Sequence, residues 1–185
     1  MPLEVVAFDW GGTLVEDPGL YPGPMAHWPV VAAVPGAAEA LAALVPHYRL
    51  VVATNADESA AALVLAALAR VGLADPFEAV FSSADLGVAK PDAAFYKAMT
   101  DQLDVSPAAV VTVGDNFLND VAGARAAGLQ AIWLDRRALP ERRPAALWTP
   151  AAAGSPPGAP VPADTLRIRR LSELPAALDQ LSCTP

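Results

Sequence analysis

Four short segments of the chain combine carboxylates, hydroxyls, amides and a lysine with residues that turn the backbone sharply. The segments are Phe8-Asp9-Trp10-Gly11-Gly12-Thr13-Leu14, Ala53-Thr54-Asn55, Lys90-Pro91 and Gly114-Asp115-Asn116-Phe117-Leu118-Asn119-Asp120. If Asp9, Asp115 and Asp120 gather around one point, they repel one another and raise their pKa values unless a cation lies between them. A hard cation that prefers oxygen ligands, such as Mg²⁺, resolves that repulsion. The aspartates therefore predict a magnesium site if the fold brings them together.

Two of these carboxylates, Asp9 and Asp120, also have a simpler interpretation. Asp9 ends an apolar run and precedes Gly11-Gly12, where the backbone can approach a ligand closely. The alternative is that Asp9 only begins a turn. For Asp120 the alternative is that it complements the N-terminus of a helix, as acidic residues commonly do.

The polar residues of the two middle segments leave similar alternatives open. Thr54 and Asn55 follow an apolar run, and Asn55 stands three residues before Glu58, the spacing of a helix capping box. A hydroxyl and free N–H groups at a helix N-terminus are also a natural phosphate site. Lys90 is the only basic residue between Arg70 and Lys97, and its alternative is a solvated surface charge.

Apolar periodicity and turn residues predict alternating strands and helices. The predicted strands are 4–9, 49–53, 79–81, 110–113, 129–134 and 165–169, and the predicted helices are 35–45, 58–71, 92–103, 118–127 and 172–181. Continuous apolar strands of this kind favour an α/β fold, a Rossmann-like three-layer α/β/α sandwich with a mainly parallel sheet. Ligands bind at the carboxyl ends of such strands. The singled-out polar residues all follow a predicted strand end or lie in a tight loop beside one.

Length and composition limit the organisation of the chain. We expect one domain over residues 1–185, because 185 residues are enough for one sizeable core. Residues 136–163 form a Pro-rich irregular connection in this interpretation, with seven prolines and no apolar period. The last predicted strand and helix follow it, so the connection interrupts the domain and does not end it.

Composition also indicates the setting in which the chain works. The longest strongly apolar helical stretch, 60–69, is closed by Arg70 and is shorter than the roughly 20 residues that span a bilayer. The start of the chain has no basic segment of a signal peptide, so a cytoplasmic location is expected. Cys183, the single cysteine, excludes an internal disulfide. A net charge of −8 argues against a nucleic-acid partner.

The four segments, in this order, resemble the four sequence motifs of the haloacid dehalogenase-like hydrolases, and the resemblance covers nearly the whole chain outside the Pro-rich stretch. It implies a phosphatase in which Asp9 attacks phosphorus and forms an aspartyl-phosphate. It implies that Mg²⁺ is bound by the Asp9 carboxylate, the Gly11 carbonyl and Asp115, with Asp120 as a further ligand or a supporting residue. Thr54 and Lys90 act on the phosphoryl group in this scheme. The implied substrate-binding residues are Trp10, Gly11, Thr54, Asn55 and Lys90.

The chain departs from the family at Gly11, where phosphatases of this superfamily typically carry a second aspartate that protonates the leaving group and later activates water. General acid–base catalysis contributes about 10²–10⁴-fold, so turnover should be slowed unless another residue substitutes. Glu16 and His27 are the nearest candidates in sequence. Hydrolysis should be slowed least for substrates whose leaving groups need no protonation. We therefore expect p-nitrophenyl phosphate to be hydrolysed far better than alkyl phosphates.

Two other functions remain open. Gly11 is compatible with a catalytically degenerate protein that binds phosphate or a partner, and dehalogenases of the family also lack the second aspartate. Dehalogenases rely on a substantial cap, however, and the roughly twenty residues between Val15 and Pro35 are too few for a helical cap domain. A loop with Tyr21, His27 and Trp28 either shades the open site or is pinned to the core. The expected substrate is a small phosphorylated molecule or a phosphorylated macromolecule, and the sequence does not predict the oligomeric state.

Overall fold

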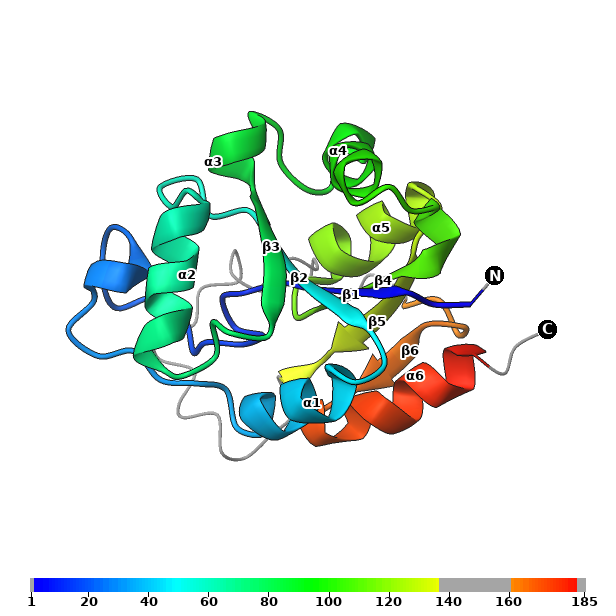
Figure 1. Cartoon of the computed structure of the whole chain (residues 1–185), viewed down its shortest axis with the longest axis horizontal. Coiled ribbons are helices and arrows are strands. Elements are labelled where there is room, and N and C mark those ends of the chain that lie inside the picture. The colour runs from blue at the N-terminus through cyan, green and yellow to red at the C-terminus, as the bar shows by residue number, and fades with distance from the viewer. Residues whose placement is uncertain (1, 137–160, 183–185) are drawn as a thin grey trace.

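A computed structural model describes residues 2–136 and 161–182, and a six-stranded sheet lies at its centre (Figure 1). The strand order is β3-β2-β1-β4-β5-β6, and every neighbouring pair is parallel. The strands are β1 Val5–Phe8, β2 Arg49–Thr54, β3 Phe77–Ser82, β4 Val110–Gly114, β5 Gln130–Leu134 and β6 Leu166–Ile168. All six predicted strands are therefore found, with ends displaced by at most two residues.

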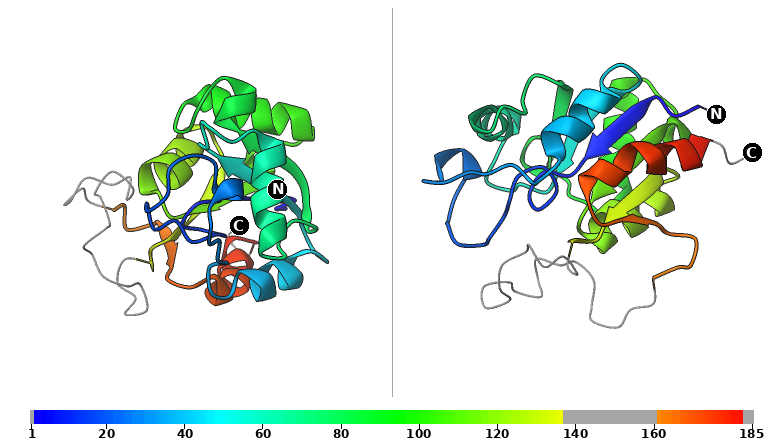
Figure 2. Two further views of the ribbon diagram at one scale, coloured as in Figure 1. Left: turned by 90° about the vertical axis from the view of Figure 1, so that its left-hand side faces the viewer. Right: turned by 90° about the horizontal axis from the view of Figure 1, so that it is seen from below.

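Helices cover both faces of the sheet. The α-helices are α1 Ala37–Leu44, α2 Ala61–Arg70, α3 Ser83–Leu86, α4 Ala93–Leu103, α5 Gly123–Ala126 and α6 Leu174–Ser182. Short helical turns include η1 Met25–His27, the π-helical turn η3 Phe117–Ala122 and η6 Leu171–Glu173. Figure 2 shows α1 and α6 side by side on one face, while α4 and α5 lie on the other. The predicted three-layer α/β/α sandwich is confirmed.

Alternating side chains of β1 produce the two halves of the core, because successive residues of a strand point to opposite faces. Val6 and Phe8 belong to the apolar cluster that includes residues of α1, α2 and α6. Val5 and Ala7 belong to the cluster that includes Phe95 of α4. All four β1 side chains are fully buried, so this central strand is held from both sides and its carboxyl end has a fixed position.

The connection from β1 to α1 carries only the short turn η1 and no helical cap. Trp28 is buried, its ring packs on Tyr21 with centroids 5.6 Å apart, and its indole N–H donates to the Gly23 carbonyl. Arg70 of α2 donates to the carbonyls of Ala26 and Trp28. Both interpretations of this loop hold in part, because Trp28 pins it to the core and also lines the cavity at the strand ends.

Two of the observed helical segments differ from the helices predicted from the sequence. The helix predicted at 58–71 begins at Ala61, because Asp85 of the unpredicted helix α3 accepts the Ala61 N–H at 2.7 Å and so caps α2. The helix predicted at 118–127 is divided into η3 and α5, and Asn116 accepts the Asn119 N–H at its start.

Two segments discussed from the sequence lie wholly or mostly outside the residues that the structure describes. The Pro-rich connection predicted at 136–163 lies outside them except at its two ends, and so does Cys183. Within residues 2–136 and 161–182, every helix is too short or too polar to cross a bilayer.

Replacing Asp85 with alanine should lower the free energy of unfolding at pH 7 by about 0.5–2 kcal/mol, the usual cost of a lost helix cap. Hydrogen bonds from the Ser82 hydroxyl and the Ala61 N–H lower the pKa of Asp85. A lowered folded-state pKa gives stability that is present above the unfolded pKa of about 3.9 and is lost as the pH falls through the folded value. Urea titrations at pH 7 and pH 3 should therefore show a smaller difference at pH 3.

The control for this experiment is Asp179→Ala, which removes an exposed aspartate from α6. Its effect should stay within about 0.5 kcal/mol at both pH values. A loss at pH 7 in the Asp85 variant that is no larger than in the control would show that α2 does not depend on this cap.

Candidate active site

The predicted site residues meet at the carboxyl edge of the central strands. Phe8 of β1 is in register with Val52 of β2 and Val113 of β4, so the residues that follow these strands emerge together. A cavity of about 340 Å³ opens there. It is lined by all the predicted site residues, Asp9, Trp10, Gly11, Thr54, Asn55, Lys90, Asp115 and Asp120, and also by Asp17, Met25, Trp28, Asp57, Glu58, Asn116 and Asn119.

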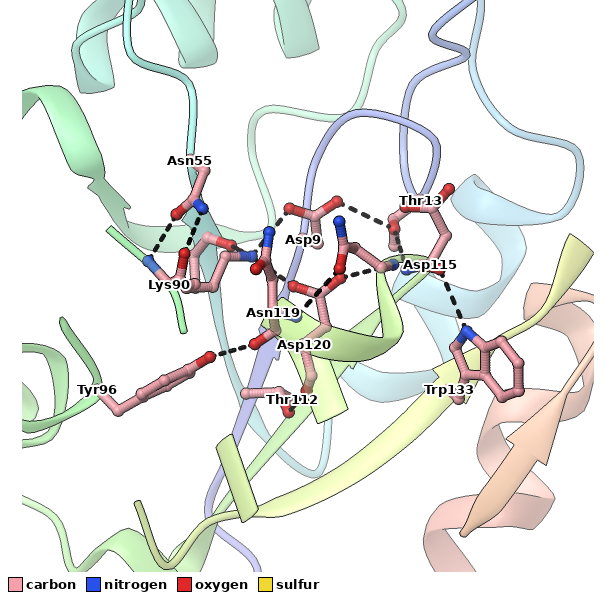
Figure 3. Close-up of polar contacts among 12 residues, drawn as sticks. Asp9, Thr13, Asn55, Lys90, Tyr96, Thr112, Asp115, Asn119, Asp120 and Trp133 are labelled. Atoms are coloured by element: carbon pink, nitrogen blue, oxygen red, sulfur yellow. Dashed lines mark hydrogen bonds and ion pairs between the residues drawn. The ribbon is translucent and has the colours of Figure 1, made fainter. Parts of the chain in front are cut away.

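Three aspartates form a compact carboxylate cluster in this cavity (Figure 3). One carboxylate oxygen from each of Asp9, Asp115 and Asp120 lies within 4.8 Å of the others. Two glycines make room for them, since a Cβ on Gly12 would lie 2.5 Å from the Asp115 carboxylate and one on Gly114 would overlap Asp120. Gly12 also has a φ of +78°, which disfavours any side chain. Converging oxygen ligands of this kind suit a hard divalent cation.

Lys90 is buried between two of these carboxylates. Its Nζ lies 2.5 Å from Asp120 and 3.0 Å from Asp9, and it also donates to the Ala53 carbonyl at 2.7 Å. Burial by itself lowers the pKa of Lys90, but the charges of Asp120 and Asp9 outweigh burial, so the pKa is raised above its usual value. The two carboxylates therefore favour the charged form of Lys90 inside the site, and because the side chain is buried, its interpretation as a solvated surface charge is wrong.

Asp120 is held from both sides of its carboxylate. Its Oδ1 accepts from Lys90, and its Oδ2 accepts the Asn116 N–H at 2.9 Å. Burial raises the pKa of Asp120 to about 6, opposed by the charge of Lys90. The Asp120 side chain is only 2% exposed, whereas Asp9 and Asp115 are less deeply buried. Asp120 therefore orients Lys90 from the most buried position of the cluster.

Thr13 links the Asp9 carboxylate to the backbone of Asp115. Its hydroxyl donates to Asp9 Oδ2 at 3.3 Å and accepts the Asp115 N–H at 3.2 Å. The Trp133 indole N–H from β5 donates to the Asp115 carbonyl, as Figure 3 shows. Thr13 is a site residue that was not predicted from the sequence, although it stands only four residues after Asp9.

Asn55 fixes the position of Lys90. Its amide nitrogen donates to the Lys90 carbonyl at 2.7 Å, and its amide oxygen accepts the Lys90 N–H at 2.8 Å. The alternative that Asn55 caps a helix is therefore wrong, because its side chain is used across the site and α2 begins six residues later. Thr54 is buried at the end of β2 and lines the cavity.

An arginine that the sequence analysis missed holds the loop after Asp9. Arg136, directly beyond β5, is buried and donates to the Gly12 carbonyl at 3.0 Å and to both carboxylate oxygens of Glu16. Glu16 is therefore engaged in an ion pair and does not line the cavity. His27 is exposed on η1 and does not line it either. No local pattern marks Arg136, because its partners lie about 120 residues away in sequence.

Comparison with known sequences gives one family. Residues 29–128 match haloacid dehalogenase-like hydrolase, a range that contains Lys90, Asp115 and Asp120 but not Asp9. Phosphoserine phosphatase from Thermus thermophilus is 40% identical over 74 residues, 40% of this chain and 30% of that protein. Phosphoglycolate phosphatase from Rhodospirillum rubrum is 40% identical over 99 residues, 53% of this chain and 39% of that protein. The matched segments span only 30% and 39% of the length of these two curated relatives.

Comparison with solved structures gives the same fold. An uncharacterized protein from Listeria monocytogenes serotype 4b superimposes with a TM-score of 0.79 at 24% identity, covering 97% of this chain and 98% of the other. A HAD phosphatase from Thermococcus onnurineus gives 0.68 at 19% identity, covering 95% and 98%. L-2-haloacid dehalogenase from Xanthobacter autotrophicus gives 0.72 at 19% identity, covering 96% and 98%. At these identities the likeness establishes the fold alone.

Replacing Lys90 with methionine should lower the free energy of unfolding by about 3–5 kcal/mol, because it leaves two carboxylates close together without their cation. The matched control is Lys97→Met, since Lys97 also pairs with an aspartate at 2.6 Å but is exposed on α4. Its loss should be below about 1 kcal/mol. Urea unfolding of both variants without added metal measures the difference. Equal losses would contradict the structural importance of the buried pair.

Proposed function

The chain belongs to the haloacid dehalogenase-like hydrolase family, and on that premise we propose that it is a magnesium-dependent phosphatase that forms an aspartyl-phosphate on Asp9. The observation that carries the proposal is the cluster of Asp9, Asp115 and Asp120 carboxylates within 4.8 Å of one another beside the buried Lys90. Curated relatives that match parts of the chain are named phosphatases. The proposed substrate is a small phosphorylated molecule or a phosphorylated macromolecule.

The donor set fits magnesium. The carboxylates of Asp9 and Asp115 and the Gly11 carbonyl would hold the ion, with Asp120 as a further ligand or as the residue that orients Lys90. The bound ion would draw the phosphoryl oxygens toward the site and offset their negative charge. Without it, three carboxylates and one lysine leave the cluster with a net negative charge, which opposes binding of a phosphate.

The chain's own residues supply the remaining steps. An Asp9 oxygen attacks phosphorus while Thr13 and Lys90 hold the carboxylate in position. Lys90 offsets charge on the equatorial oxygens, and the Thr54 hydroxyl and backbone N–H groups orient the phosphoryl group, a catalysis by positioning and electrostatics. Trp10 and Asn55 complete the substrate-binding set that we propose. Trp10 is buried, and its indole nitrogen has no hydrogen-bond partner among the described residues.

Gly11 has no side chain that can transfer a proton. Without an acid–base group the reaction would lose about 10²–10⁴-fold in rate, and the loss would be greatest for alkyl leaving groups. The glycine is not required by the backbone, since its φ is not positive and a Cβ there would meet only ordinary contacts. Activity on poor leaving groups therefore depends on another group in the cavity.

A second candidate function is a catalytically degenerate protein that binds phosphate or a phosphorylated partner, and Gly11 is the observation that favours it. Such a protein would bind Mg²⁺ and phosphate without forming a covalent intermediate. Carbon–halogen cleavage, the reaction named for one structural neighbour, would instead proceed on 2-haloacids in the presence of a chelator. The three-carboxylate cluster argues for the metal-dependent reaction.

Replacing Asp9 with asparagine should reduce hydrolysis of p-nitrophenyl phosphate by at least about 10³-fold, because the amide is a poor nucleophile. The amide keeps nearly the shape of the carboxylate, so folding should be preserved. The wild-type chain, quenched during turnover and treated with borohydride, should carry homoserine at position 9 in a peptide mass spectrum. Turnover should also stop when the metal is chelated.

Three outcomes separate the candidates. Metal-dependent turnover with homoserine at position 9 supports the phosphatase. Binding of Mg²⁺ and phosphate without formation of homoserine at position 9 supports the binding protein. Turnover that is unaffected by Asp9→Asn contradicts the assignment of Asp9 as the nucleophile.

A further inference from the structure

The space beside Gly11 contains a carboxylate from another part of the chain. A Cβ atom on Gly11 would lie 3.5 Å from Oδ2 of Asp17 and 3.7 Å from the Asp17 Cβ. These are ordinary van der Waals distances, so the Asp17 carboxylate adjoins the volume that an aspartate side chain at position 11 would enter. Asp17 also lines the cavity that contains Asp9 and Gly11.

Resting on the proposed function, we propose that Asp17 is the general acid and base of this site and supplies the carboxylate that position 11 lacks. In the first step Asp9 bonds to phosphorus, the bond from phosphorus to the leaving oxygen breaks, and protonated Asp17 gives its proton to that oxygen. In the second step water attacks the phosphorus of the aspartyl-phosphate. The bond to Asp9 then breaks, and Asp17 takes the proton that the water loses.

One carboxylate oxygen of Asp17 is fixed and the other is available. Oδ1 accepts the Gly19 N–H at 3.0 Å, which orients the side chain. For Oδ2, the part of the chain described by the structure offers no hydrogen-bond or ion-pair partner. An acid–base group needs a fixed direction and an oxygen that can exchange a proton, and Oδ2 of Asp17 adjoins the volume beside Gly11.

The loop that carries Asp17 is anchored immediately before it. The Glu16 N–H donates to the Ala32 carbonyl at 2.9 Å, and the Glu16 carboxylate is paired with the buried Arg136. Arg136 also donates to the Gly12 carbonyl, next to Gly11 in the chain. Arg136 therefore holds both the segment that contains Gly11 and the loop that carries Asp17.

Other carboxylates of the cavity are less suited to this role. Asp120 is buried against Lys90, and Asp57 accepts the Ser83 hydroxyl at 2.7 Å. Glu58 lines the cavity too, but the three atoms nearest to a Cβ on Gly11 belong to Asp17 and Met25. The strong preference for p-nitrophenyl phosphate that Gly11 alone predicts should then belong to a variant without the Asp17 carboxylate, and the wild-type chain should show a smaller preference.

The test is Asp17→Asn, whose amide oxygen can still accept from Gly19. We expect kcat/KM for an alkyl phosphate such as glycerol 3-phosphate to fall by about 10²–10⁴-fold. The value for p-nitrophenyl phosphate should fall less than tenfold, since nitrophenolate leaves without protonation. Glu58→Gln removes one charge from the same cavity and serves as the matched control, in which the ratio of the two substrates should stay unchanged.

Gly11→Asp, introduced into the Asp17→Asn chain, places a carboxylate in the same volume and should restore at least tenfold of the lost activity on glycerol 3-phosphate. An unchanged substrate ratio in Asp17→Asn, an equal loss on both substrates, or no restoration by Gly11→Asp would each overturn the inference while Asp9-dependent hydrolysis of p-nitrophenyl phosphate persists. A wild-type chain that hydrolyses neither substrate overturns the proposed function, and this inference falls with it.

Discussion

The site depends on one buried ammonium group between two carboxylates. Lys90 contacts Asp9, at the end of β1, and Asp120, in η3 beyond β4, so a single charge joins segments from two neighbouring strands. A buried carboxylate without a partner would be protonated or would destabilise the fold. The two hydrogen bonds from Asn55 keep Lys90 at this place. The arrangement fixes the direction of Asp9 and keeps its carboxylate in one cluster with that of Asp115.

Backbone geometry makes this concentration of charge possible. Parallel strands bring their carboxyl ends to one edge, and Gly12 and Gly114 remove the Cβ atoms that would collide with Asp115 and Asp120. Arg136 then holds the loop after β1 in place, because it donates to the Gly12 carbonyl. Since general acid–base groups must reach the leaving oxygen at the open side of such a site, a carboxylate on the β1–α1 loop is well placed to replace one on the strand end.

The sequence was sufficient for the features that follow from periodicity and strand ends. Apolar runs identified all six strands, and the polar residues after them, such as Asp9 and Asp115, converge as predicted. Asn55 and Glu58 had the spacing of a capping box, but the backbone of Lys90 competes for the Asn55 amide, and a carboxylate on an unpredicted helix caps α2 instead. Local spacing could not reveal that competition, since the partners are 24 or more residues apart.

The remaining features depend on loops, which have no period from which to predict a position. Asp17 lies six residues after Gly11, and only the turn of the loop brings its carboxylate back to that glycine.

The proposed chemistry requires a divalent ion held between Asp9 and Asp115. The most direct measurement is the anomalous scattering of a crystal of the wild-type chain grown with Mn²⁺ in place of Mg²⁺. We predict a single strong peak between the carboxylates of Asp9 and Asp115, with Lys90 still in contact with Asp120; a cavity without that peak at saturating Mn²⁺ would contradict the account.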